Sequence, residues 1–105
     1  MNHFGLFGKF ITKEGERDAL VDILLRAAQS MQDLEDCEIY TVHVSPEESN
    51  SVFVYEVWKD ESAHQASLLL EATQELIQSA KPLIAGMERI CTIKPIGGKG
   101  LTTPS

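Results

Sequence analysis

Residues 51–64 of the chain read SVFVYEVWKDESAH, and they combine a strand pattern with the start of a helix. β-branched and aromatic residues dominate positions 51–59, a composition typical of a β-strand. Both alternating sets of side chains are apolar, so neither face of this strand is expected to lie against water. Asp60 is a good helix N-cap, and apolar residues then recur at helical spacing until Pro82. The stretch predicts a covered strand followed by a helix from about Asp60 to Ala80.

The segment before this strand is expected to complete a β-hairpin. Cys37 to Val44 contains the β-branched and aromatic residues of a strand. Ser45 to Asn50 then supplies proline, serine and asparagine, which favour a turn. The two strands are therefore predicted to be neighbours in one sheet.

The rest of the chain alternates between strand and helix patterns. His3 to Ile11 is apolar on both faces, as in a covered strand. Residues 20–34 place apolar side chains three and four positions apart, which predicts an amphipathic helix. Met87 to Lys94 alternates again and is expected to be the last strand.

The resulting order, βαββαβ, predicts an α+β fold of the ferredoxin-like class, in which two helices cover one face of a four-stranded antiparallel sheet. Right-handed crossovers place both helices on the same face, so the opposite face remains bare. Because the strands at residues 3–11 and 51–59 are apolar on both sides, the bare face is expected to form an interface. We expect a homodimer through these open sheet faces, of the dimeric α/β barrel type.

Length, charge and composition restrict the classes of function. The chain has 105 residues and a net charge of -7, from nine Lys and Arg against sixteen Asp and Glu. This charge argues against nucleic acid or an anionic membrane as a partner. No apolar segment is long enough to span a bilayer, and we expect a soluble, cytoplasmic protein. Residues 1–95 are expected to form one domain, and residues 96–105, rich in glycine, threonine and proline, a flexible tail.

Neither the cysteines nor the histidines form a recognisable site. Cys37 and Cys91 fall on the two outer strands of the expected sheet, so a disulfide between them is not predicted. No two histidines have the close spacing of a metal site. The sequence therefore predicts no metal.

The segments Lys13 to Gly15, Cys37 to Tyr40 and Tyr55 to His64, the last with Glu-x-Trp before a capped helix, resemble the antibiotic biosynthesis monooxygenase domain. The resemblance extends over residues 3–95. It implies a dimeric ferredoxin-like protein in a family that includes oxygenases of polycyclic phenols or quinols, which use no metal, flavin or nicotinamide. The family also includes haem-degrading relatives and proteins without demonstrated activity.

The chain departs from the family pattern at three positions, two of which, Gly8 and Ser67, would carry the haem chemistry that the resemblance implies. Many members have histidines nine and fourteen residues after the tryptophan, where this sequence has Ser67 and Ala72. The haem-degrading branch has an asparagine in the first strand where this sequence has Gly8. No cofactor is therefore predicted.

The candidate site residues are Glu56, Trp58, Tyr55 and His64. Glu56 and Trp58 share one face of a strand, so the carboxylate and the indole are expected side by side. Glu56 is the expected general base and His64 a second one, with Trp58 and Tyr55 contacting the substrate. Structural alternatives remain for two of them: Trp58 as a core anchor, and Glu56 as a salt-bridge partner of a basic residue of the last strand, Arg89 or Lys94.

These residues and the resemblance lead to three hypotheses for the function of the protein. The first is a cofactor-independent monooxygenase that oxidises a planar phenol or quinol with O₂. The second is a non-catalytic dimeric module that binds an aromatic or lipid-like metabolite. An isomerase of a small sugar-derived signal, the activity of one branch of the family, is a third reading that no particular residue favours.

Overall fold

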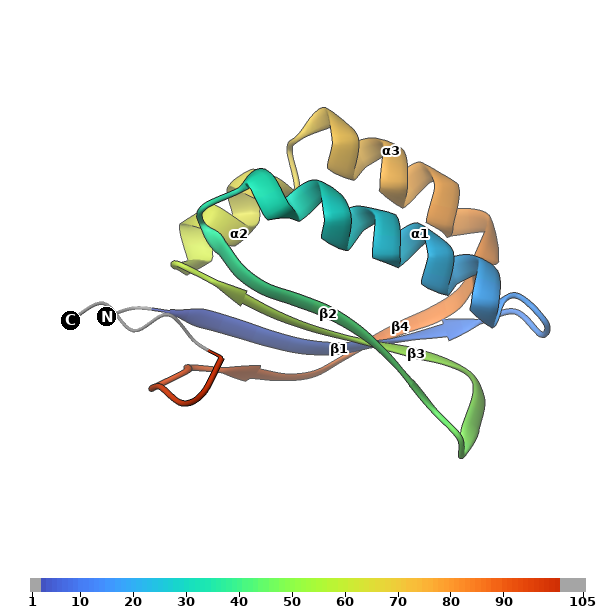
Figure 1. The fold of residues 1–105 in the computed structure, drawn as a ribbon. Helices are drawn as coiled ribbons and strands as arrows, with labels where there is room; N and C mark the ends of the chain where they lie inside the picture. Colours follow the sequence, from blue (N-terminus) through green and yellow to red (C-terminus); the bar gives the residue numbers. More distant parts are fainter. Residues whose placement is uncertain (1–2, 101–105) are drawn as a thin grey trace.

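The computed structural model describes residues 3–100 and shows helices on one face of a four-stranded antiparallel sheet (Figure 1). The strand order is β2-β3-β1-β4, so β1 and β3 are central and β2 and β4 are the outer strands. The elements are β1 (Phe4–Thr12), α1 (Arg17–Ser30), β2 (Cys37–Ser45), β3 (Glu48–Trp58), α2 (Glu61–Ser67), α3 (Glu71–Ala80) and β4 (Ile84–Ile93), with short 3-10 helices at Met31–Asp33 and Lys81–Leu83. The predicted ferredoxin-like fold is confirmed.

The helix predicted from Asp60 to Ala80 is two helices. Asp60 caps α2 as expected, because its Oδ1 accepts a hydrogen bond from the Ala63 N–H at 2.7 Å. The Ser67 hydroxyl donates to the His64 carbonyl at 2.6 Å, a contact that competes with continued helix geometry. Leu70 is extended, and α3 begins after it. The sequence did not predict this break, because the three consecutive leucines at positions 68–70 fit the apolar pattern of one continuous helix as well as that of two helices.

The main core lies between α1 and the centre of the sheet. Leu20 and Leu24 of α1 pack with Val52 and Val54 of β3, and Ala80 of α3 completes this buried cluster. Each large apolar side chain buried in this way contributes about 1.5–3 kcal/mol to folding. The apolar face predicted for the first helix is therefore the face that holds it on the sheet.

A glycine allows the chain to pass from β1 into α1. Gly15 has a φ of 81°, a conformation that other residues adopt only with strain. At the other end of the chain, residues 96–100 belong to no helix or strand, and the remainder of the predicted tail, residues 101–105, lies outside the described residues.

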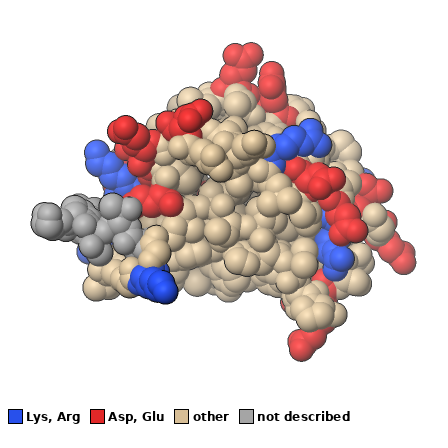
Figure 2. Space-filling view, in the orientation of Figure 1, with Lys and Arg blue, Asp and Glu red and all other residues tan. Residues whose placement is uncertain are grey.

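Uncharged residues make up most of the visible face, and acidic side chains are prominent among the charged groups around the helical layer, with basic side chains separate from one another (Figure 2). This distribution offers no continuous basic patch on the face shown. Within residues 3–100, no helix combines the length and the apolar character needed to cross a bilayer.

Candidate active site

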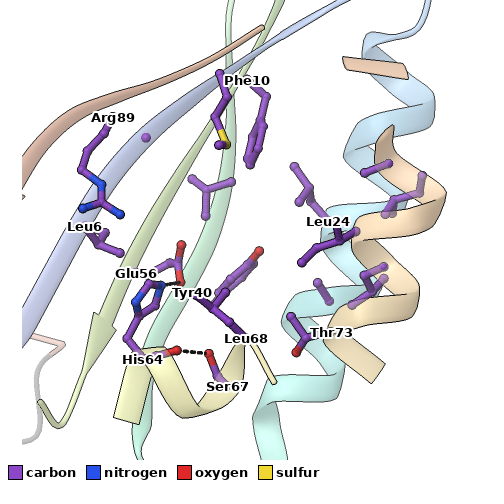
Figure 3. A pocket seen from close by; sticks show the side chains of 18 of the residues that line it. Leu6, Phe10, Leu24, Tyr40, Glu56, His64, Ser67, Leu68, Thr73 and Arg89 are labelled. Atoms are coloured by element: carbon purple, nitrogen blue, oxygen red, sulfur yellow. Dashed lines mark hydrogen bonds and ion pairs between the residues drawn. The ribbon is translucent and has the colours of Figure 1, made fainter. Parts of the chain in front are cut away.

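A cavity of about 610 Å³ lies between the helices and the sheet. Its walls are mainly apolar and come from α1, α3 and the covered face of the sheet, including Phe10, Leu24 and Ile77. Polar groups gather where α2 meets β3, around Glu56 and His64 (Figure 3). The arrangement combines a large apolar volume with a small polar end, as ligand pockets commonly do.

Glu56 and Trp58 lie on the cavity face of β3, as their alternation predicts. The Trp58 Nε1–H donates a hydrogen bond to Glu56 Oε1 at 3.0 Å. The Trp58 side chain is almost fully buried, with 1% of the residue exposed. The indole therefore acts as a core anchor and also fixes the orientation of the carboxylate. Trp58 also lines the cavity, and its contact with a substrate stays a prediction.

His64 faces the same carboxylate from α2. Its Nε2 lies 3.9 Å from Glu56 Oε1, and its ring meets the edge of Trp58 at a centroid distance of 5.7 Å. Burial lowers the pKa of His64, the Glu56 charge opposes this effect, and the Arg89 charge lowers the pKa further. A lowered pKa leaves the imidazole neutral at neutral pH, a state in which it can accept a proton.

Tyr40 is a further polar group of the cavity, contributed by β2. It pairs with Glu56 across the hairpin. Burial, and then the negative charge of Glu56, raises the pKa of Tyr40 well above its usual range. The phenol therefore stays protonated and can donate a hydrogen bond to a ligand oxygen.

Tyr55 lies on the opposite face of the sheet, away from the cavity. It lines a shallow depression on the open face together with Phe7, Phe53 and Cys91. Consecutive strand residues point to opposite faces, so the neighbour of Glu56 cannot share its cavity. The structure brings together Glu56, Trp58 and His64 of the expected site, and Tyr40 occupies the place expected for Tyr55.

The salt bridge considered between Glu56 and Arg89 or Lys94 does not form. Among residues 3–100, the only basic side chain within ion-pair distance of Glu56 is His64, whose imidazole is neutral at neutral pH. The carboxylate thus keeps capacity to interact with a ligand.

The cysteines remain apart, on the outer strands β2 and β4, and both are free. Burial raises the pKa of the Cys37 thiol to about 11, with Glu56 and Glu38 adding to the effect. Cys37 is therefore a protonated thiol at neutral pH and a poor nucleophile.

The antibiotic biosynthesis monooxygenase family model matches residues 4–79, which run from β1 to the penultimate residue of α3 and include Tyr40, Glu56, Trp58 and His64. The chain belongs to this family. A solved structure from Chloroflexus aurantiacus J-10-fl, assigned to the same family, is 33% identical, covers 96% of this chain and 100% of its own, and has a TM-score of 0.84.

More distant relatives share the fold. A protein from Shewanella oneidensis is 22% identical with a TM-score of 0.81, over 90% of this chain and 91% of its own. A protein from Bacteroides thetaiotaomicron VPI-5482 is 14% identical with a TM-score of 0.82, over 98% of this chain and 97% of its own. The search of curated proteins found no match.

The structure also places the three residues at which the sequence departs from the expected family pattern. Gly8 and Ser67 both line the cavity, but Gly8 has no side chain and the Ser67 hydroxyl is bonded to the His64 carbonyl. Ala72 lies on the exposed side of α3. Residues 3–100 contain no group of three or more His, Cys, Asp or Glu arranged to hold a metal ion.

Proposed function

We propose that the protein is a cofactor-independent monooxygenase that oxidises a planar phenol or quinol with O₂. The observation that carries the proposal is the Glu56 carboxylate, oriented by Trp58 and facing a neutral His64 at the polar end of a large apolar cavity. The volume of about 610 Å³ suits a molecule of two or three fused rings.

The chemistry needs a base, a dry site and oxygen. Glu56 Oε1 already accepts a hydrogen bond from the Trp58 N–H, so the other carboxylate oxygen is available to accept the proton of a phenol. The phenolate that forms is electron-rich and passes an electron to O₂. With an anthrone as substrate, O₂ takes four electrons from two C–H bonds; one oxygen atom becomes the new carbonyl and the other leaves as water. No external reductant is required.

The two other polar groups of the cavity assist this reaction. Neutral His64 is a second group that can accept the substrate proton, because its Nε2 lies 3.9 Å from the Glu56 carboxylate, at the same end of the cavity. The protonated Tyr40 phenol can donate to a quinone oxygen. Apolar walls keep water away from the reactive intermediates.

We also propose that the protein is a homodimer through the open sheet face. Phe7 and Phe53 stack there with a centroid distance of 5.9 Å, and each is only partly buried in one chain. Ile11 and Ile93 are each 39% exposed on the same face. Val57 lies on the same face of β3 but is already fully buried between Gly5 and Ile39 on the neighbouring strands, so the proposed interface rests on the aromatic pair.

The test is incubation of the protein with a panel of anthrones and naphthoquinols under ¹⁸O₂ and under nitrogen, followed by mass spectrometry of the products. The proposal predicts one labelled oxygen atom in the product, at a rate above that of buffer and only when O₂ is present. Binding without any change of mass across the panel would contradict it, and would support the rival function of a ligand-binding module.

A further inference from the structure

Arg89 is a basic residue of the cavity for which the proposed reaction has no role. Its guanidinium end points toward the Glu56–His64 pair (Figure 3). Within residues 3–100, no carboxylate lies within ion-pair distance of it, since the ion pairs join His3 to Glu38, Lys9 to Glu48, Arg17 to Asp18 and His64 to Glu56.

A β-bulge in β4 turns Arg89 toward the cavity. Cys91 pairs with Phe7 on the open face, so an uninterrupted ladder would place Arg89 opposite Lys9, on that same face. The register shifts by one residue at Ile90, and Arg89 pairs instead with Gly8, on the cavity face. Bulges often aim side chains into sites in this way.

Gly8 leaves room beside the arginine. A Cβ built at Gly8 would have only the Glu88 carbonyl oxygen within 4 Å, at 3.7 Å. The space that a side chain would fill at this position therefore remains part of the cavity. A ligand group can approach the guanidinium there.

The other cations that touch the cavity do not offer the same site. Lys9 is held by Glu48, and Lys81 follows α3 at the end of the fold away from α2 (Figure 1). The chain as a whole carries a net charge of -7, which repels anions in general. Arg89 is thus the local positive charge beside the polar end of the cavity.

We infer that Arg89 is the anion-binding residue of the cavity, and that the ligand is a planar apolar molecule carrying one anionic oxygen group, a carboxylate or the phenolate of an acidic phenol. The guanidinium would hold this group by charge-assisted hydrogen bonds while the rings occupy the apolar part of the cavity. The inference rests on the proposed function, which places the substrate in this cavity. It adds that the substrate carries a negative charge.

The experiment is calorimetric titration of naphthoate, naphthamide and an acidic nitronaphthol, anaerobically at about pH 8, where an unperturbed histidine is neutral. Naphthamide has nearly the shape of naphthoate without its charge. We expect the two anions to bind roughly ten-fold tighter than the amide, the order of a partly exposed charge-assisted hydrogen bond. The tighter of the two anions identifies the group that Arg89 recognises.

Arg89→Met should abolish this preference and leave naphthamide binding unchanged, while Arg89→Lys should retain part of it. Arg26→Met is the matched control, because Arg26 is exposed on α1 and does not line the cavity. Equal binding of the anions and the amide, a preference that persists in Arg89→Met, or no binding of any probe would overturn the inference. The titration measures binding without turnover, so it can succeed even if the oxygenase reaction fails.

Discussion

The two faces of β3 differ in what they contact, although their residues alternate along one strand. One face carries Glu56 and Trp58 under the helices, where a hydrogen bond and a neighbouring imidazole fix the carboxylate. The other carries Phe53 and Tyr55, partly exposed and without a helix over them. A substitution at one position is therefore expected to affect one face and spare its neighbour on the other.

The two proposals together would account for a strand that is apolar on both sides. Under them, the apolar residues of the cavity face receive a ligand, and those of the open face receive a second copy of the chain. Each proposal can be tested separately, because the side chains that carry them point in opposite directions.

The largest expected effect is on the open face. Phe53→Lys places a cation where the aromatic stack would be buried, and we expect it to weaken the dimer by several kcal/mol, about a thousand-fold or more. Sedimentation velocity at micromolar concentration measures this. Leu25→Lys is the control, since Leu25 is an exposed apolar residue of α1. A monomeric parent protein, or a dimer that Phe53→Lys leaves intact, would show that the open face is not the interface.

A smaller effect is expected from the buried tryptophan on the cavity face. Trp58→Phe removes the N–H donor of Glu56 Oε1 and part of the buried ring, and we expect the free energy of unfolding to fall by about 2–3 kcal/mol. Urea denaturation followed by circular dichroism measures the change. Tyr55→Phe, which removes a phenolic hydroxyl group on the other face, should lower the free energy of unfolding by less than about 0.5 kcal/mol. Equal losses in the two variants would refute the distinction between the faces.

The smallest expected effect is a pH dependence of stability that belongs to His64. Its pKa is lower in the folded protein than in the unfolded chain, mainly because of burial. The unfolded chain therefore binds the proton first as pH falls, and the contribution of this group to stability decreases as pH drops through the unperturbed histidine pKa of about 6.5.

The free energy of unfolding of His64→Gln, measured by denaturation from neutral to mildly acidic pH, should therefore depend less on pH than that of the parent protein. His43→Gln provides the comparison, because His43 is exposed on the open side of β2. If His64→Gln leaves this pH dependence unchanged, or if removing His64 makes it steeper, the assigned environment of His64 is wrong.

The fold was largely predictable because alternation, helical spacing and the Asp60 cap act locally. The break after Ser67 was not, since the leucines that follow fit a continuous helix as well as an interrupted one. For the site, the shared face of Glu56 and Trp58 followed from alternation. The separation of Tyr55 from its neighbour Glu56 could have been inferred from the same rule.

The remaining features of the site depend on pairing between strands. Tyr40 reaches the cavity because the β2–β3 register places it opposite Glu56. Arg89 and Cys91 have the same parity in sequence but face opposite sides, because the bulge lies between them. Neither the register nor the bulge leaves a signal in the local sequence pattern.

The central claim is that Glu56, and not its neighbour on the other face, acts as the base of an oxygenase. The most direct test is O₂ uptake with an anthrone, measured in parallel for the parent protein, Glu56→Gln and Tyr55→Phe. Glutamine keeps an oxygen for the Trp58 N–H but cannot take the substrate proton, so we predict a rate lower by roughly 10²- to 10⁴-fold with binding retained, and an unchanged rate for Tyr55→Phe. A Glu56→Gln protein as fast as the parent, or a parent no faster than buffer, would contradict the account.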